Sequence, residues 1–416
     1  MNRETTLKSY KEIRSFTEKL CEPLETEDFV IQSMPDMSPT KWHLAHTSWF
    51  FETFVLKEVE KKYRSINEHY AFLFNSYYVQ AGERFFRPHR GLVSRPTVKE
   101  VFDYRAYVDQ NMLELLETST DETYDKIKIV VEIGLNHEQQ HQELMLTDIK
   151  HLFSMNPLYP IYRPINNSSK TDFGKINWCE FNEGIYKIGY NGNNFFYDNE
   201  KPVHKIYLNN FKIADRLVTN REYIEFIEDD GYSRAEIWLS DGFAAVEREK
   251  WVAPLYWRKV EGEWMYFTLN GFREVELDEP VSHVSHYEAD TYARWADARL
   301  ATEAEWEVAS REIKINGNFV ESEIFHPSPS LDDNKIKQMY GNVWEWTQSN
   351  YLPYPGYKVP EGAIGEYNGK FMSGQMVLRG GSCATSYSHI RNTYRNFFPP
   401  HSRWQFMGIR LAKDGI

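Results

Sequence analysis

LNHEQQHQEL, residues 135–144, lies within a helical pattern that runs from about residue 124 to about residue 153. Apolar residues recur there every three or four positions, and two histidines share their stripe: Val130, Ile133, His137, His141 and Leu144. One helical turn separates His137 from His141, so both imidazoles face the same side and can share a metal ion. Glu143 points elsewhere, which suits supporting a ligand better than binding the metal. A hydrogen-bonded histidine pair in the core, without a metal, is the alternative.

The same segment contains HEQQH, which matches the H-E-x-x-H pattern of zinc proteases with Glu138 as general base. Such a hydrolase needs a third metal ligand farther along the chain. His151 is the next candidate, and a proline-rich stretch follows it without the glycine-and-histidine extension of the metzincins. A zinc hydrolase therefore stays open as a rival interpretation that lacks its third ligand.

A third histidine is supplied by SPTKWHLAHTSWFFE, residues 38–52, where Ser38 before a proline predicts the N-cap of a helix. We expect this helix to be amphipathic, and either His43 or His46 can face a partner helix. His46 is the better inward candidate because it shares a side with Trp42 and other aromatic residues. Three neutral imidazoles leave up to three open positions on an octahedral metal, which suits iron(II) binding a substrate and O₂ together. A tetrahedral zinc ion with one water fits the same ligands.

The two halves of the chain differ in texture. Residues 1–155 show long helical periods, with further helices expected at 5–20 and 97–118, which suggests a four-helix bundle. A linker is expected over 156–179, because its proline, asparagine and serine clusters favour an extended surface path. Residues 180–416 hold most of the glycines and many short aromatic runs, which predicts an irregular α+β domain. Within this domain, helices are expected at 219–228, 287–296 and 302–311.

Composition narrows the classes of partner. The formal net charge of −13 argues against a nucleic-acid surface, which needs basic residues to displace counterions. No stretch approaches the roughly 18 apolar residues of a membrane span, and the polar N-terminus lacks a signal core, so we expect a cytoplasmic protein. The three cysteines are far apart and odd in number, which disfavours a disulfide framework or a cysteine-based zinc site. The many aromatic residues suit a cationic or planar ligand as well as an ordinary core.

The histidine motifs resemble those of a known enzyme family. W-H-L-A-H, residues 42–46, and H-E-Q-Q-H-Q-E, residues 137–143, are similar to the DinB-like domain of the ergothioneine-pathway sulfoxide synthases. The resemblance implies iron(II) as the cofactor, with His46, His137 and His141 as its ligands and His43 outside the ligand set.

The second half independently resembles the formylglycine-generating-enzyme fold, an irregular α+β fold related to C-type lectins. The motifs that carry this resemblance are F-x-I-A-x-x-x-V-T-N-x-E-Y (211–223), R-L-A-T-E-A-E-W-E (299–307), Y-G-N-V-W-E-W-T (340–347), L-R-G-G-S (378–382) and F-M-G-I-R-L-A (406–412). The formylglycine-generating enzymes carry two copper-binding cysteines after R-G-G-S, whereas Cys383 is the only cysteine in that region here. The domain is therefore expected to be a scaffold rather than a copper oxidase, with Cys383 as a small buried residue.

F-N-S-Y-Y, residues 74–78, resembles a subgroup of the synthases in which paired tyrosines from the helical domain line the iron centre. Tyr77 and Tyr78 are then expected as catalytic residues that supply a proton or a hydrogen bond during O₂ activation. Adjacent residues on a regular helix point about 100° apart, so both can reach one site only where the backbone is irregular. A packed core tyrosine is the alternative for each of them.

Further residues are expected to bind the substrates. R-F-F-R-P-H-R-G, residues 84–91, places Arg87 and Arg90 in a turn, where guanidinium groups can bind the carboxylate of a thiol substrate. A solvated basic loop is the alternative. Gln140, between the two ligand histidines, is expected to hydrogen-bond the imidazole of hercynine, which is Nα-trimethylhistidine. Trp404 and Phe406 are expected beside its trimethylammonium cation.

The reaction that the resemblance implies is O₂-dependent joining of L-cysteine to C2 of the hercynine imidazole, giving hercynylcysteine sulfoxide in ergothioneine biosynthesis. Cysteine is expected in place of γ-glutamylcysteine because the tyrosine pair resembles the cysteine-using subgroup. Ovothiol synthases are the close relatives to exclude, and a non-catalytic binding protein also stays open. The expected partners are these small molecules and O₂, with neither nucleic acid nor membrane, and homo-oligomerisation is left open.

Overall fold

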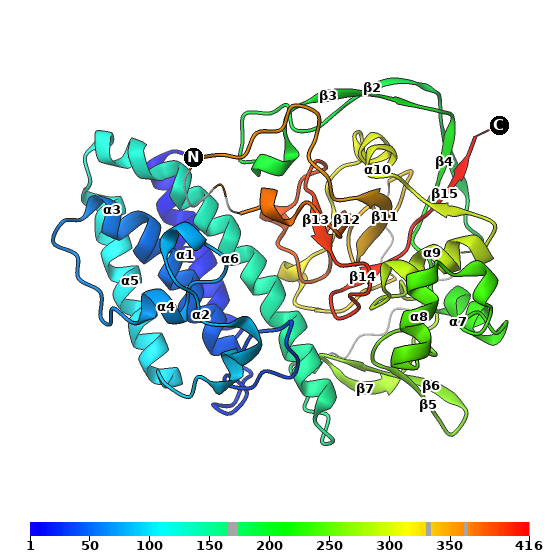
Figure 1. Cartoon of the computed structure of the whole chain (residues 1–416), viewed down its shortest axis with the longest axis horizontal. Coiled ribbons are helices and arrows are strands. Elements are labelled where there is room, and N and C mark those ends of the chain that lie inside the picture. The colour runs from blue at the N-terminus through cyan, green and yellow to red at the C-terminus, as the bar shows by residue number, and fades with distance from the viewer. Residues whose placement is uncertain (165–173, 330–333, 362–364, 366, 416) are drawn as a thin grey trace. The chain divides into compact units, whose positions relative to one another are not determined.

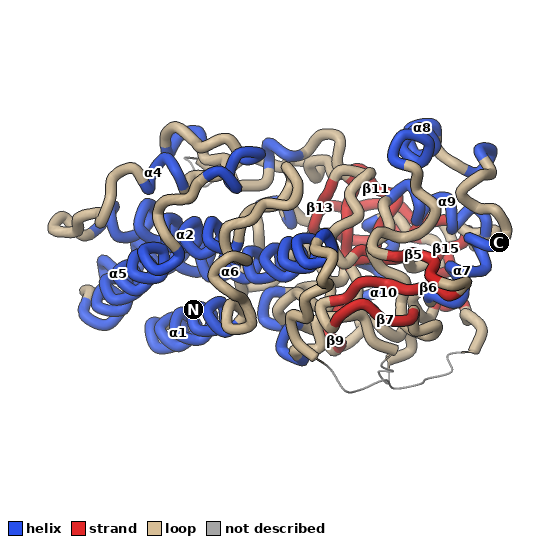
Figure 2. The backbone as a smooth tube through the Cα atoms, turned by 90° about the horizontal axis from the view of Figure 1, so that it is seen from below, coloured by secondary structure: helices blue, strands red, loops and turns tan. Residues whose placement is uncertain are grey.

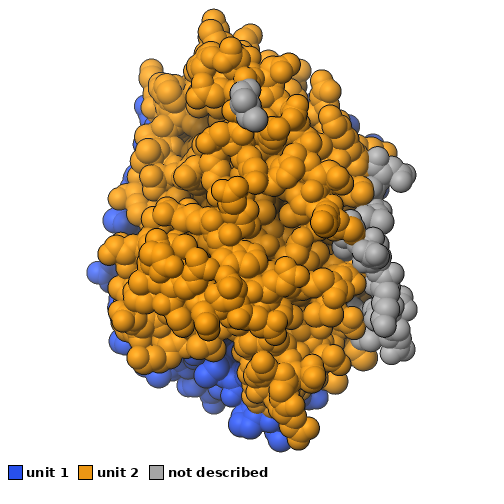
Figure 3. Space-filling model, turned by 90° about the vertical axis from the view of Figure 1, so that its right-hand side faces the viewer, with its two compact units in different colours: residues 1–158, 359–367 blue, residues 159–358, 368–416 orange. Residues whose placement is uncertain are grey.

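The computed structural model of the protein describes residues 1–164, 174–329, 334–361, 365 and 367–415. Its chain forms two compact units (Figure 3). Unit 1 contains Met1–Leu158 together with Val359–Tyr367, and unit 2 contains Tyr159–Lys358 together with Asn368–Ile416. Much of the expected linker, residues 165–173, lies outside the described residues. The return of the chain to unit 1 near residue 360 was not expected from the sequence.

Four long helices build unit 1 (Figure 1): α1 (Arg3–Lys19), α2 (Thr40–Phe51), α5 (Val98–Thr118) and α6 (Asp121–Met155). Helix α6 packs against α1 and α2, and α5 packs against α2. The side chain of Thr97 caps α5 by accepting a hydrogen bond from the backbone of Glu100, and Thr120 caps α6 by accepting one from the backbone of Thr123. The predicted fold, a helical DinB-like region followed by an α+β domain, is confirmed.

Helix α2 runs through the interior of unit 1. All 12 of its residues are buried, so the expectation of an amphipathic helix was wrong. The side that would face solvent is covered by the segment after the short helices α3 (Lys57–Val59) and α4 (Tyr70–Leu73). Lys41 donates to the carbonyl groups of Val93 and Pro96, and the indole N–H of Trp42 donates to the carbonyl of Leu73.

Two local features of α2 differ from a regular helix. Pro39 occupies the N-cap position, so the prediction of Ser38 as N-cap was wrong, and the Ser38 hydroxyl instead accepts a hydrogen bond from Arg90. At the other end, α2 continues into a five-residue π-helix, Glu52–Leu56. π-Helical turns of this kind are frequent at functional sites.

Gly134 allows α6 to approach α2 closely. A Cβ atom at this position would lie 2.6 Å from the ring of Phe51 and 2.8 Å from the ring of Phe50. Both aromatic residues are buried on α2, so a larger residue would push the two helices apart. Because His137 follows Gly134 by one turn, the same close approach brings α6 histidines toward α2.

Unit 2 is an irregular α+β unit, and every strand among the described residues belongs to it (red in Figure 2). One four-stranded sheet has the order β1-β4-β15-β8 and a second has the order β13-β12-β11-β14. A three-stranded sheet, β5-β6-β7, and two strand pairs, β2-β3 and β10-β9, complete the unit. The C-terminal strand β15 pairs antiparallel with both β4 and β8, so it lies in the interior of the first sheet.

The strands are β1 (Trp178–Phe181), β2 (Gly184–Ile188), β3 (His204–Leu208), β4 (Phe211–Ala214), β5 (Trp257–Val260), β6 (Glu263–Thr268), β7 (Gly271–Glu274), β8 (Arg299–Leu300), β9 (Gly317–Asn318), β10 (Tyr340–Gly341), β11 (Trp344–Asn350), β12 (Met376–Arg379), β13 (Asn396–Phe398), β14 (Met407–Gly408) and β15 (Leu411–Asp414). Their short lengths agree with the glycine-rich, aromatic texture of this half.

Four helices accompany these strands: α7 (Asn220–Glu228), α8 (Ser240–Glu249), α9 (His286–Trp295) and α10 (Glu303–Ser310). Helices α7, α9 and α10 each begin with a capping box, and each was predicted. Helix α8 was not predicted, because Leu239 gives it no side-chain cap and Gly242 lies in its first turn. None of the described helices combines the length and the apolarity that a bilayer crossing requires.

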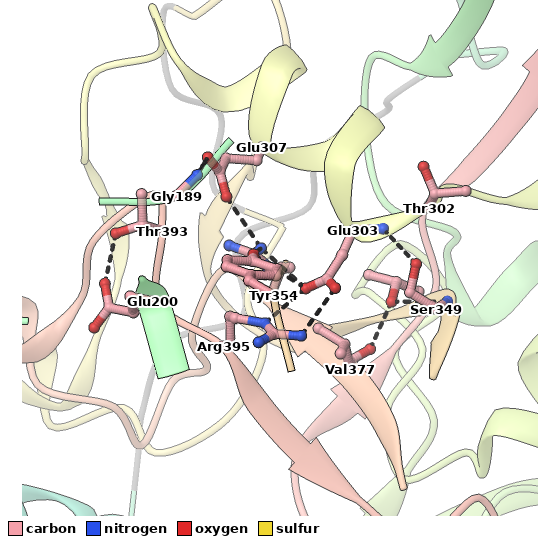
Figure 4. Close-up of polar contacts among 12 residues, drawn as sticks. Gly189, Glu200, Thr302, Glu303, Glu307, Ser349, Tyr354, Val377, Thr393 and Arg395 are labelled. Atoms are coloured by element: carbon pink, nitrogen blue, oxygen red, sulfur yellow. Dashed lines mark hydrogen bonds and ion pairs between the residues drawn. The ribbon is translucent and has the colours of Figure 1, made fainter. Parts of the chain in front are cut away.

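Buried ion pairs account for several of the motif residues in unit 2. Arg379, from L-R-G-G-S, is fully buried and donates to Glu303 at 3.2 Å, to Glu307 at 3.1 Å and to the Tyr354 hydroxyl. Figure 4 shows Arg395 pointing at Glu303, to which it donates two hydrogen bonds. Because each charge has hydrogen-bonded partners, the network is tolerated in the interior, and these motifs serve the core of the unit.

Candidate metal centre

Three histidine side chains from two helices meet inside unit 1. His46 lies on α2, and His137 and His141 lie one turn apart on α6. The Nε2 atom of His137 is 3.3 Å from Nε2 of His46 and 3.0 Å from Nε2 of His141. All three side chains are buried. Nitrogen atoms gathered in this way can act together as ligands of one metal ion.

Burial keeps the three imidazoles neutral. It lowers the pKa of His137 to about 3 and lowers the pKa values of His46 and His141 well below 6.5, and neighbouring histidines add to the effect at His46 and His141. The Nδ1 atom of His46 lies 2.5 Å from the carbonyl oxygen of Phe74, which can only accept, so Nδ1 carries the proton and Nε2 the lone pair. Neutral nitrogen donors without a carboxylate fit a divalent first-row metal such as iron(II) or zinc.

Aromatic rings enclose the cluster. The rings of Trp42 and Trp49 stack with the imidazole of His46, at centroid distances of 4.6 Å and 5.4 Å. The ring of Phe50 lies 4.9 Å from that of His137. These rings exclude water from one side of the cluster and hold the imidazoles in fixed orientations, as a preorganised metal site requires.

Glu138, the general base of the zinc-hydrolase interpretation, faces α1 and α5. Its carboxylate is fully buried and accepts hydrogen bonds from Arg14 at 2.8 Å, Arg105 at 2.6 Å and Thr17 at 2.7 Å. Burial alone would raise the pKa of Glu138, but Arg105 and Arg14 lower it to about 2. A carboxylate paired with two arginines is a poor proton acceptor at neutral pH. His151, the candidate third ligand of that interpretation, contacts Ser33 and lies outside the cluster.

Tyr77 and Tyr78 lie just after α4, where the backbone is not helical. Their rings stack, with centroids 4.6 Å apart and 29° between the planes, so the irregular backbone lets adjacent residues share one side. Tyr78 is fully buried and its ring lies 5.6 Å from that of Trp49, the residue that also stacks with His46. The pair therefore adjoins the aromatic wall of the histidine cluster.

Arg87 and Arg90 begin and centre a short 3₁₀-helix, Arg87–Leu92, but their environments differ. Arg90 is only 4% exposed, its guanidinium lies 3.3 Å above the centre of the Trp42 ring, and it donates to the Ser38 hydroxyl at 2.8 Å. Its Nε atom has no hydrogen-bond partner among the described residues. Burial, reinforced by the nearby charge of Arg87, lowers the pKa of Arg90 well below its ordinary value. Such a buried cation favours an anionic ligand, whereas Arg87 is exposed.

Gln140 has a partner that the sequence did not suggest. The hydroxyl of Tyr367 donates a hydrogen bond to Oε1 of Gln140, and the Tyr367 ring lies 5.6 Å from that of His137 and 6.1 Å from that of Tyr77. Tyr367 belongs to the segment that returns to unit 1. In the sequence it stands in no recognisable motif, 227 positions from Gln140, so no local signal pointed to it.

Trp404 and Phe406, the residues expected beside the trimethylammonium group, belong to unit 2. Phe406 is fully buried with its ring 4.8 Å from that of His283, and Trp404 is partly exposed with its ring 5.9 Å from that of Phe398. Their role in substrate binding stays a prediction. Cys383 is fully buried and unpaired, as the scaffold interpretation expects.

Comparison with known protein families matches both halves of the chain. The family described as the DinB superfamily matches residues 9–145, which carry the histidine cluster. The family described as the sulfatase-modifying factor enzyme 1-like domain matches residues 181–415.

Curated relatives match across both halves. The chain is 35% identical to a hercynine oxygenase of Mycobacterium tuberculosis, over 52% of this chain and 56% of that protein. It is 31% identical to a hercynine oxygenase of Mycolicibacterium smegmatis, over 75% of this chain and 78% of that protein. A hercynine oxygenase of Mycolicibacterium thermoresistibile is 28% identical, over 91% of this chain and 88% of that protein.

Proposed function

This chain belongs to the hercynine oxygenase family, and from that premise we propose that it is a non-haem iron(II) enzyme that joins L-cysteine to the imidazole of hercynine. The observation that carries the proposal is the buried cluster of His46, His137 and His141, three neutral nitrogen donors without a carboxylate. Such a set leaves positions on the metal for a thiolate, an imidazole and O₂.

The proposed reaction balances without a further reductant. The cysteine S–H and the imidazole C2–H supply two hydrogens and four electrons to O₂. One oxygen atom becomes the sulfoxide oxygen, the other leaves as water, and a C–S bond forms. Bound iron(II) would supply the one-electron chemistry that lets O₂ react with a thiol.

Arg90 is the proposed anchor for the cysteine carboxylate. Its guanidinium is buried on Trp42 and already shaped by one hydrogen bond to Ser38, so little side-chain entropy is lost when a carboxylate binds. A carboxylate would also compensate the buried charge. Arg87, which is exposed and donates to the carbonyl of Asp36, is proposed to add attraction at the entrance.

Gln140 is proposed to orient the hercynine imidazole. Since its Oε1 accepts from Tyr367, the amide N–H groups are the part of Gln140 that we expect to donate to an unprotonated imidazole nitrogen. Tyr367 therefore acts as a positioning residue for Gln140 in this proposal.

Tyr77 and Tyr78 are proposed as the catalytic residues that deliver a proton during O₂ reduction. Water formation consumes protons, and a phenol held in an aromatic wall beside the histidines can supply one at the reacting oxygen. The two stacked rings also limit access of bulk water, which protects the thiol from simple oxidation.

L-cysteine is proposed as the thiol in preference to γ-glutamylcysteine, because the tyrosine pair resembles the cysteine-using subgroup. Ergothioneine biosynthesis is proposed as the pathway, and a relative of Schizosaccharomyces pombe bears the name ergothioneine biosynthesis protein 1. We place the enzyme in the cytoplasm, since its three buried cysteines are unpaired. The alternative zinc hydrolase is disfavoured by the arginine pairing of Glu138.

The test is to prepare metal-free protein, load it anaerobically with iron(II) or zinc(II), and add hercynine, L-cysteine and O₂. We expect hercynylcysteine sulfoxide, identified by mass spectrometry, with iron(II) alone. Equal product with zinc(II), or hydrolytic activity that zinc(II) restores, would refute the proposal.

A further inference from the structure

The nitrogen of His141 that faces away from the cluster is part of a buried chain of polar contacts. Its Nδ1 lies 2.7 Å from Nδ1 of His43, and Nε2 of His43 lies 2.9 Å from Oδ2 of Asp148. The same carboxylate oxygen accepts a hydrogen bond from the backbone N–H of Ser38 at 2.9 Å. The four residues are buried, with exposed fractions of 8% or less.

The chemistry of these atoms assigns the protons in one direction. A carboxylate accepts hydrogen bonds, so Nε2 of His43 carries a hydrogen and donates it to Asp148. In neutral His43 the remaining nitrogen, Nδ1, is then an acceptor. Two nitrogens 2.7 Å apart need one hydrogen between them, and it belongs to Nδ1 of His141. His141 is left with its lone pair on Nε2, the atom that lies 3.0 Å from Nε2 of His137.

We propose that His43 and Asp148 are positioning residues that hold His141 as its Nδ1–H tautomer, with Nε2 presented to the metal. The inference rests on the proposed function in taking His141 as an Nε2 ligand. It explains why α2 carries two buried histidines three residues apart: His46 belongs to the metal cluster, and His43 supports a ligand from the other helix.

The backbone fixes this support without the metal. Asp148 lies two turns beyond His141 on α6, and its carboxylate is held by Ser38, the residue two positions before α2 begins. Ser38 in turn accepts from Arg90, so the chain of contacts ends at the proposed carboxylate anchor. Groups that orient a histidine ligand in this way typically change metal affinity by about 10- to 100-fold.

The direct test is the tautomer of His141 in metal-free, otherwise unmodified protein with ¹⁵N-labelled histidines. Long-range ¹H–¹⁵N spectra distinguish a protonated Nδ1 from a protonated Nε2, and a His141→Asn sample assigns the signal. We expect protonation at Nδ1. Protonation of His141 at Nε2 overturns the inference, whether or not any variant folds.

The affinity test compares two substitutions at one position. His43→Leu removes the acceptor while keeping similar bulk, and His43→Asn keeps an oxygen near the place of Nδ1. By anaerobic calorimetry, we expect iron(II) to bind His43→Leu about 10- to 100-fold more weakly than wild type, and His43→Asn to recover most of the loss. His151→Leu, on the same helix but outside the cluster, should bind iron(II) like wild type.

Wild-type affinity for iron(II) in His43→Leu, or an equal loss in His43→Leu and His43→Asn, would show that His43 only fills space. If wild-type protein itself fails to bind iron(II), the proposed function fails, whereas the tautomer spectrum still decides the inference.

Discussion

The Nε2 atoms of His46 and His137 lie 3.3 Å apart, although 91 positions separate the two residues in the chain. This proximity depends on the close packing of α2 against α6, where Gly134 leaves room for the rings of Phe50 and Phe51. Two neutral imidazoles without a carboxylate nearby gain little from such an arrangement unless they share a cation. The packing therefore points to a metal site.

Replacing His46, His137 or His141 by alanine should abolish stoichiometric iron(II) binding, because a site with two remaining imidazoles loses a large part of its affinity. His43→Ala should still take up iron when the metal is supplied in excess, since His43 supports a ligand and is not one itself. Metal content after anaerobic loading and desalting checks both expectations. Iron retained by His46→Ala but lost by His43→Ala would mean that the two histidines have exchanged roles.

Removing Arg90 should weaken binding of the thiol substrate selectively. A charge-assisted pair with a carboxylate that is out of water is worth roughly 2–5 kcal/mol, so the apparent KM for L-cysteine in Arg90→Ala should rise at least tenfold. The KM for hercynine should change little. Arg87→Ala, at an exposed position of the same turn, should show a smaller effect. Equal increases for both substrates would indicate that Arg90 only holds the turn in place.

Replacing Tyr77 and Tyr78 together by phenylalanine should leave iron and both substrates bound and redirect O₂ toward cysteine sulfinate. The rings and their stacking are kept, so only the proton donors are lost, and general acid catalysis of this kind is worth about 10²–10⁴-fold. Mass spectrometry of the products gives the sulfoxide-to-sulfinate ratio. An unchanged rate and ratio would assign the tyrosines to packing alone.

His286, buried at the start of α9 in unit 2, should make the stability of the protein acid-sensitive. Burial lowers the pKa of His286 from 6.5 to about 4, with a partial offset from the backbone of Thr347. Between these values the unfolded chain binds a proton that the folded chain resists, so stability falls as the pH drops from 6.5 toward 4. The loss amounts to about 3 kcal/mol.

Substituting His286 by phenylalanine should remove this part of the pH dependence. Urea unfolding of unit 2, followed at pH 7 and pH 4, should show a smaller loss of unfolding free energy in His286→Phe than in wild type. Parallel losses in the two proteins would mean that His286 is protonated equally in the folded and unfolded states.

Local periodicity predicted the features that depend on neighbouring residues. The spacing of His137 and His141 placed both on one helix face, and the serine and threonine caps marked α7, α9 and α10 within one or two residues. The preference for His46 over His43 needed the resemblance to a family as well. Both histidines proved to be buried, so burial alone would not have separated them.

Contacts between distant segments could not be predicted in this way. The burial of every residue of α2 depends on the segment after α4, which covers its outer side, and no pattern within α2 reports that cover. Tyr367 reaches Gln140 only because the chain returns to unit 1 after most of unit 2 is complete. The contact of His43 with Asp148 likewise joins two helices that the sequence does not align.

Oxygen consumption by iron(II)-loaded protein tests the central claim most directly. With hercynine and L-cysteine both present, the account predicts uptake of one O₂ for each hercynylcysteine sulfoxide formed, and little uptake with either substrate alone or when γ-glutamylcysteine replaces cysteine. Uptake that does not require hercynine, or sulfoxide formation without O₂ uptake, would contradict it.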